Sequence, residues 1–129
     1  MRPILFIFAI LFFFGCEKPN SPNENEFIFP DSKISYNRHV QPLFFKYCAL
    51  SGCHEPFTRK SNLDLTSYSS LRLRFNDVVI PKDTVLSRII WRIEGRPGFL
   101  PMPPTGPLTS NQIAGIKKWI TEGATDSIP

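Results

Sequence analysis

The sequence predicts a small, mainly helical domain. Three stretches place apolar residues at helical spacing, and each has a residue suited to begin or end a helix. No two stretches alternate apolar and polar residues in the way that paired strands do. The chain has 129 residues and no internal repeat, which fits one folded domain.

The first helical stretch is SYNRHVQPLFFKYC, residues 35–48. Its apolar stripe, at positions i, i+3, i+4 and i+7, consists of Val40, Leu43, Phe44 and Tyr47. Pro42 fits only the first turn of a helix, because its ring removes a backbone donor and clashes with the preceding turn. This helix is therefore expected to begin within a few residues of Pro42.

The second stretch is KDTVLSRIIWRIEG, residues 82–95, with Asp83 as the expected N-cap and Gly95 at its end. Its stripe consists of Val85, Leu86, Ile89, Ile90 and Ile93. A further short helical turn is expected near residues 67–73. The segment after the second stretch, residues 95–108, holds five prolines and three glycines, so no regular structure is expected there.

The third stretch is LTSNQIAGIKKWITEGA, residues 108–124. Thr109 and Gln112 have the spacing of a capping box, in which each side chain bonds the other residue's backbone N–H. Gly123 lies where a C-terminal cap belongs. The shared apolar face consists of Ile113, Ile116, Trp119 and Ile120.

The N-terminus reads as a targeting segment. Residues 1–15 contain Arg2 followed by an apolar run that is too short for an ordinary membrane-spanning helix. The end of this run, FFGC, resembles the lipobox of bacterial lipoproteins, which implies cleavage before Cys16 and acylation of its sulfur. Acyl chains there would hold an exported protein on a membrane surface, at the periplasmic or outer-envelope face. A plain signal peptide and an uncleaved anchor are the alternatives.

After residue 15, the composition of the sequence distinguishes a tether, a folded domain and a short tail. Residues 16–31 are rich in Pro, Asn and Glu and are expected to form a flexible tether. The domain is expected at residues 32–124, followed by a tail at 125–129. The formal net charge is +4, without a run of Lys or Arg, so nucleic acid is not an expected partner.

The richest pattern is CALSGCH, which runs from Cys48 to His54. Two thiols in an exported, oxidising compartment are expected to be bonded to something. A disulfide between Cys48 and Cys53 is one interpretation, and a zinc site that also uses His54, with or without His39, is a second. Adjacent Cys and His residues are awkward for one tetrahedral site, and a disulfide does not account for the histidine.

Covalent haem is the third interpretation. A histidine directly after the second cysteine would be held over the iron of a haem bonded to both sulfurs. The spacing here is C-x4-C-H, two residues longer than the familiar C-x-x-C-H motif. Gly52 can adopt positive φ and let the longer loop bulge. Met102, on the proline-rich segment, is the candidate second iron ligand, and His39 is its competitor.

These motifs resemble small class I-like cytochromes c, the planctomycete-type modules of exported bacterial proteins. The resemblance covers about residues 34–124 and is most specific in MPPTGPLTSNQIAGIKKWITEGA. It implies a cytochrome c-like helical fold around one haem c, with Cys48 and Cys53 as covalent attachment sites. It also implies His54 as the proximal iron ligand, Met102 as the distal one, and first and last helices that cross near the haem edge.

The implied function is single-electron transfer between redox proteins, with no small-molecule substrate and no enzyme activity of its own. No Ser/His/Asp-like catalytic set is visible in the sequence. Two alternatives are a haem sensor or peroxidase-like protein with an open axial position, and a non-haem envelope module held by a disulfide. The candidate partners for haem propionates are Arg72, Arg74, Arg92 and Arg96.

Overall fold

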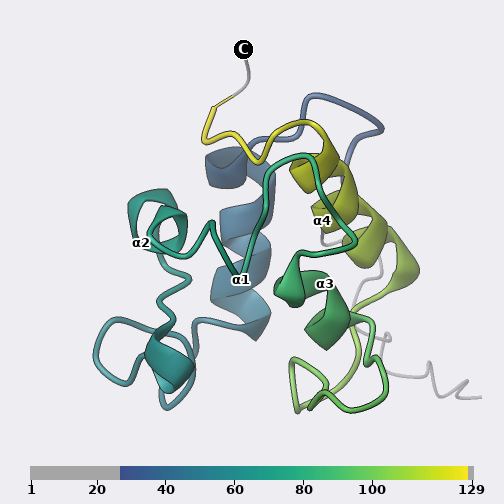
Figure 1. Ribbon diagram of the computed structural model, residues 1–129. Helices are drawn as coiled ribbons and strands as arrows, with labels where there is room; N and C mark the ends of the chain where they lie inside the picture. The colour runs from purple at the N-terminus through teal and green to yellow at the C-terminus, as the bar shows by residue number, and fades with distance from the viewer. Residues whose placement is uncertain (1–26, 128–129) are drawn as a thin grey trace, which may run out of the picture.

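The computed structural model describes residues 27–127. Its helical elements are η1 (Tyr36–Val40), α1 (Gln41–Tyr47), η2 (Lys60–Asn62), α2 (Tyr68–Arg72), α3 (Arg88–Ile93) and α4 (Ser110–Thr121). Within residues 27–127 there is no strand, only an isolated bridge between Ile80 and Asp83. The mainly helical class is therefore confirmed. Figure 1 shows α1 in the middle of the molecule, between α2 on the left and α4 on the right, with α3 below α4.

The first predicted helix is present, and it starts earlier than its proline suggested. Ser35 is the N-cap of η1, and its hydroxyl accepts a hydrogen bond from the Arg38 N–H at 3.3 Å. A π-helical turn then leads into α1, with Pro42 in the first turn of that helix. The wider turn suits a proline that has no N–H for the α-helical ladder. Three of the four predicted stripe residues are buried: Val40, Leu43 and Phe44.

The second predicted helix is shorter than expected, and the assignment of Asp83 as its N-cap is wrong. The Asp83 carboxylate accepts hydrogen bonds from Val85 N–H at 2.8 Å and Leu86 N–H at 2.9 Å, which closes a turn. α3 begins only at Arg88, after Ser87. Val85 and Leu86 are consequently exposed, although the predicted stripe included them.

α4 matches its prediction. The Thr109 and Gln112 side chains form the expected capping box. Gly123 follows the helix with φ of +108°, a conformation in which glycine avoids the strain of a side chain. Three of the predicted face residues are fully buried: Ile116, Trp119 and Ile120.

The packed part of the chain extends beyond residues 32–124 at both ends. Phe29, within the expected tether, is buried against Gly115 of α4. A Cβ at Gly115 would lie only 2.0 Å from the Phe29 ring, so the ring occupies the space that a side chain would need. The Thr125 carbonyl accepts hydrogen bonds from Tyr36 N–H at 3.0 Å and from Trp119 Nε1 at 2.9 Å. Residues on both sides of the expected domain therefore pack onto it.

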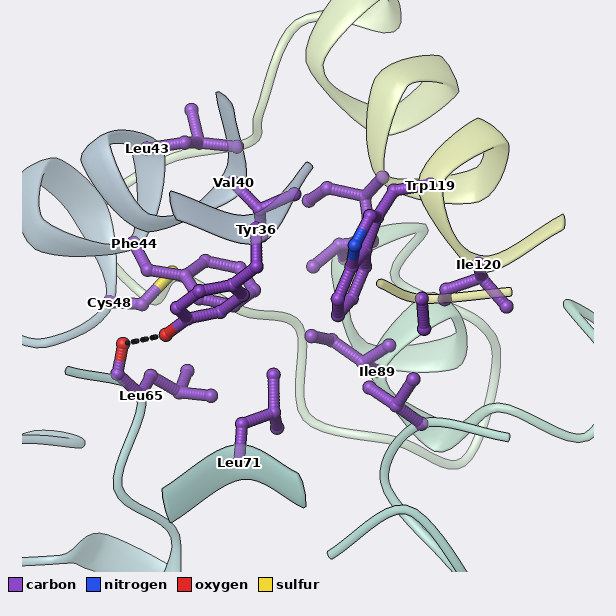
Figure 2. Close-up of a cluster of buried hydrophobic side chains, with 14 of the residues drawn as sticks. Tyr36, Val40, Leu43, Phe44, Cys48, Leu65, Leu71, Ile89, Trp119 and Ile120 are labelled. Atoms are coloured by element: carbon purple, nitrogen blue, oxygen red, sulfur yellow. Dashed lines mark hydrogen bonds between the residues drawn. The ribbon is translucent and has the colours of Figure 1, made fainter. Parts of the chain in front are cut away.

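The buried core lies where η1, α4 and the segment leading to α2 meet (Figure 2). The Tyr36 ring faces Trp119, with their centroids 5.9 Å apart. Its hydroxyl donates a hydrogen bond to the Leu65 carbonyl at 2.9 Å, drawn as the dashed line in Figure 2. Because this bond is buried, it ties the chain at Leu65 firmly to the core.

The expected signal peptide, the lipidation at Cys16 and most of the tether fall in residues 1–26, outside the described residues. Within residues 27–127 no helix has the length and apolar character needed to cross a membrane.

Candidate functional site

A cavity of about 290 Å³ lies between the end of α1, α3 and two loops. We call residues 48–65 the cysteine loop and residues 95–108 the methionine loop. All four residues that the sequence singled out for the site line this one cavity: Cys48, Cys53, His54 and Met102. The fold thus brings the methionine to the CALSGCH motif from a distant part of the chain.

The cysteine loop begins as a continuation of α1. Cys48 N–H donates to the Phe44 carbonyl at 2.8 Å, so the helix ladder positions the first thiol. The loop then turns at Gly52, whose φ is +79°, as expected for a longer spacing absorbed by glycine. His54 N–H donates back to the Cys48 carbonyl at 3.2 Å. The histidine therefore returns to the first cysteine despite the four intervening residues.

The far half of the cysteine loop is fixed as well. Lys60 N–H donates to the Cys53 carbonyl, and Leu65 N–H donates to the His54 carbonyl, each at 2.9 Å. The Arg74 guanidinium donates to the carbonyls of Ser61 at 3.1 Å and Asn62 at 2.8 Å. Backbone bonds from the loop itself and one arginine thus hold the segment that carries both cysteines.

The two cysteines are free thiols in the structure. Burial, together with the nearby Cys53 thiol, raises the pKa of the Cys48 thiol to about 12. Cys48 therefore stays protonated at neutral pH, which is the state of a structural or substrate thiol rather than of an activated nucleophile.

His54 carries an unsatisfied polar atom. Its Nδ1 is buried, and no hydrogen-bond partner for it exists among the described residues. Buried polar atoms are almost always paired, since leaving one unpaired is costly. A bound group that engages this imidazole would account for its arrangement beside the two thiols.

His39 is not part of the site. Its Nδ1 accepts a hydrogen bond from Ser35 N–H at 3.1 Å, and its ring lies 6.4 Å from that of Phe29. It does not line the cavity. Among residues 27–127, moreover, no three His, Cys, Asp or Glu side chains gather in a way that would hold a metal ion. The geometry therefore favours neither a zinc site with His39 nor His39 as an iron ligand.

The methionine loop reaches the cavity from the end of α3. Met102 N–H donates to the Arg92 carbonyl at 2.9 Å, and the Arg92 guanidinium donates to the Leu100 carbonyl at 3.2 Å. Pro103, directly after Met102, is buried. Met102 itself is half-buried at the cavity wall.

The charged residues of the cavity wall are all cationic: Lys60, Arg74, Arg88 and Arg92. Two of the four arginines suggested by the sequence, Arg72 and Arg96, do not line it, and Arg96 pairs with Glu94 at 2.9 Å instead. Sequence analysis missed Arg88, although it precedes Arg92 by four residues, the spacing of neighbours on one helix face. The wall therefore suits an apolar ligand that carries negative charge.

The apolar part of the wall comes from both loops, from α1 and α3, and from Val78 in the segment between α2 and α3. Its members include Phe44, Tyr47, Leu63, Leu65, Val78, Ile89, Ile93, Leu100 and Pro104.

Comparison of the chain with models of protein families, with curated proteins and with solved structures finds no match.

Proposed function

We propose that this protein is a mono-haem c-type cytochrome that carries single electrons between redox proteins at the cell envelope. One observation carries the proposal: two cysteines, the adjoining histidine and a methionine from a separate loop line a single, mostly apolar cavity. The fold class found is mainly helical, as such a domain requires, and the finer cytochrome c-like assignment is part of the proposal.

In this proposal the thiols of Cys48 and Cys53 each add across a vinyl group of haem. At each vinyl group a carbon–sulfur bond would form at one carbon, and the thiol hydrogen would go to the other. Covalent bonds would retain the group in a cavity that is open at the protein surface.

The residues on the two sides of the cavity have separate roles. His54 would supply an imidazole nitrogen to the iron, and the bond from its N–H to the Cys48 carbonyl fixes its backbone beside the first cysteine. Met102 would supply a thioether sulfur from the methionine loop. Thioether ligation raises the reduction potential relative to ligation by two histidines. The haem itself would supply the one-electron redox chemistry.

The remaining wall residues fit the same group. The apolar side chains would cover the macrocycle, and Lys60 and Arg92 are the candidate partners of its two carboxylates, since Arg74 and Arg88 already pair with Asp77. The cavity volume of about 290 Å³ lies near the lower end of ligand pockets, which run from about 300 to 1,000 Å³. A cavity of this size would hold part of a haem and would leave the rest accessible to redox partners.

The visible spectrum tests this function. The protein should be made in a host with cytochrome c assembly factors, and wild type should show the reversible oxidised and reduced spectra of a c-type haem. Ferric wild type should also show the far-red band of sulfur ligation, which Met102→Ala removes and Leu100→Ala retains. A colourless wild type would refute the proposal. Coloured wild type without the far-red band would favour the open-axial sensor or peroxidase-like alternative.

The envelope location is proposed from residues 1–16 of the sequence. A lipid on Cys16 would keep the carrier on a membrane surface, where its redox partners are expected. Cys16→Ser should release the protein from membranes into the soluble fraction while leaving its spectrum unchanged. Membrane retention of that variant would contradict lipid anchoring and leave the haem proposal standing.

A further inference from the structure

Arg92 holds the methionine loop at three points. Its backbone carbonyl accepts the Met102 N–H bond at 2.9 Å, and its Nη1 donates to the Leu100 carbonyl at 3.2 Å. Its guanidinium carbon also lies 5.4 Å from the centroid of the Phe99 ring, within the range of a cation–π contact. One residue therefore contacts the loop on both sides of Pro101.

The composition of the loop makes these contacts important. Prolines have no N–H, so the backbone of a segment with prolines at 97, 101, 103 and 104 can donate few hydrogen bonds of its own. A side chain that bonds a loop carbonyl replaces part of that missing network. Phe99 is also packed against Trp91, with ring centroids 5.0 Å apart. The ring is thus held by two consecutive residues of α3, and the arginine is the one that also reaches the backbone beside Met102.

We infer that Arg92 is a positioning residue for Met102: it holds the thioether at the cavity and sets how tightly the distal side is closed. The inference rests on the proposed function, because Met102 closes an iron site only if haem is bound. The Arg92 side chain lines the cavity as well, so it acts from inside the site and not from a distance.

Arg88 supplies a matched control. It lies one turn earlier on α3 and lines the same cavity, but its ion-pair partner is Asp77, at 3.7 Å, rather than the methionine loop. Replacing Arg88 therefore removes a cavity cation without removing the bond to Leu100. Arg92→Lys is a second, conservative variant, because lysine keeps a positive charge but lacks the planar fork of the guanidinium.

The experiment is an imidazole titration of the ferric haem-loaded protein, since added imidazole must displace Met102 to bind the iron. Loss of one charge-assisted hydrogen bond predicts about tenfold tighter imidazole binding in Arg92→Leu. Arg88→Leu also removes a cavity cation but keeps the bond to Leu100, so its shift should be clearly smaller than that of Arg92→Leu, and Arg92→Lys should fall between Arg92→Leu and wild type. If Arg92 contributed only to overall stability, its replacement would lower the melting temperature without a specific increase in imidazole affinity.

Equal imidazole affinity in wild type and Arg92→Leu would overturn the inference, and so would equal shifts in Arg92→Leu and Arg88→Leu. If Arg92→Leu does not fold, two milder variants test the inference. Arg92→Lys lacks the guanidinium that bonds the Leu100 carbonyl, and Phe99→Leu removes the cation–π contact, so the imidazole affinity of each replaces that of Arg92→Leu. Wild type that carries covalent haem without sulfur ligation would refute the role of Arg92 and leave haem binding intact. Wild type without haem would refute the proposed function itself.

Discussion

The cysteine loop and the methionine loop reach the same cavity but are held in different ways. Main-chain bonds at Cys48, Cys53 and His54 fold the cysteine loop back on itself, and the buried Tyr36 hydroxyl fixes its end at Leu65. The methionine loop, rich in proline, depends instead on the arginine of α3. One side of the cavity is therefore built into the core, whereas on the other side a single arginine makes the contacts that flank Met102.

The ion pairs show the same division. Arg74 bonds Asp77 at 2.6 Å while it also holds two carbonyls of the cysteine loop. At the base of the methionine loop, Glu94 bonds Lys117 of α4 and Arg96 of the loop, each at 2.9 Å, so these contacts fix the end of α3 and the start of the loop but do not reach Met102. The difference predicts that changes in the cysteine loop affect folding, and that changes in the methionine loop mainly affect ligation.

The largest effect is expected when both attachment sites are removed. Cys48→Ala with Cys53→Ala should yield a chain without haem and without a cooperative thermal transition, because a domain this small needs a staple to complete its core. Circular dichroism during heating, together with the visible spectrum, measures both properties. Met102→Ala is the control, and it should keep its haem and its cooperative melt. A native-like melt of the double variant would contradict this dependence.

Tyr36→Phe removes the buried bond that fixes the end of the cysteine loop. The Leu65 carbonyl loses its partner, so the free energy of unfolding should fall by about 1–3 kcal/mol in denaturant titrations. Tyr68→Phe is the comparison, since its hydroxyl bonds the Ala124 carbonyl at 3.0 Å from a half-buried position that water can reach. Equal losses in the two variants would argue against special anchoring of the cysteine loop.

One glycine in each loop allows a direct comparison. Gly52 has φ of +79° and Gly98 has φ of +84°, and a Cβ at either position meets no heavy atom within 4 Å. Substitution by alanine therefore costs backbone strain alone, about 1 kcal/mol. Gly52→Ala should lower the unfolding free energy, because its loop is tied to the core.

Gly98→Ala should place the same strain on a less firmly held loop. We expect a smaller change in the unfolding free energy and tighter imidazole binding to the ferric protein. The two variants need only a denaturant titration and an imidazole titration each. If Gly98→Ala destabilises as much as Gly52→Ala and leaves imidazole binding unchanged, the two loops do not differ as described.

The smallest effect is expected from pH. The hydrogen bond from Arg74 holds the pKa of the Asp77 carboxyl below its usual range, and the positive charges of Arg74 and Arg88 act in the same direction. A lowered folded-state pKa means that the unfolded chain binds the proton more readily. The stabilisation is therefore present at neutral pH and is lost as acid protonates the folded carboxyl. Melting temperatures of Asp77→Asn should depend less on pH between about pH 6 and pH 3 than those of wild type.

Local signals in the sequence predicted local features well. The capping box of Thr109 and Gln112 and the bulge at Gly52 each depend on a few adjacent residues, and both are present. Asp83 shows where this reasoning fails. A carboxylate that accepts nearby backbone N–H groups closes a turn as readily as it caps a helix, and the sequence does not distinguish the two outcomes.

Features that depend on tertiary packing were not predictable. Phe29 sits in a polar, proline-rich segment, and only the missing side chain at Gly115 of α4 gives its ring a place. Lys60 and Arg88 became candidates only when the fold brought η2 and α3 to the same cavity. Met102, by contrast, was proposed from its rigid loop, and it does line the cavity with the CALSGCH motif.

The intact mass of the exported protein under denaturing conditions tests the central proposal most directly. Matured in a host with cytochrome c assembly factors, the chain should be heavier than its processed sequence and lipid by one haem that survives denaturation. A mass equal to the chain and lipid alone, or lighter than that by the two hydrogens of a disulfide, would contradict covalent haem at Cys48 and Cys53.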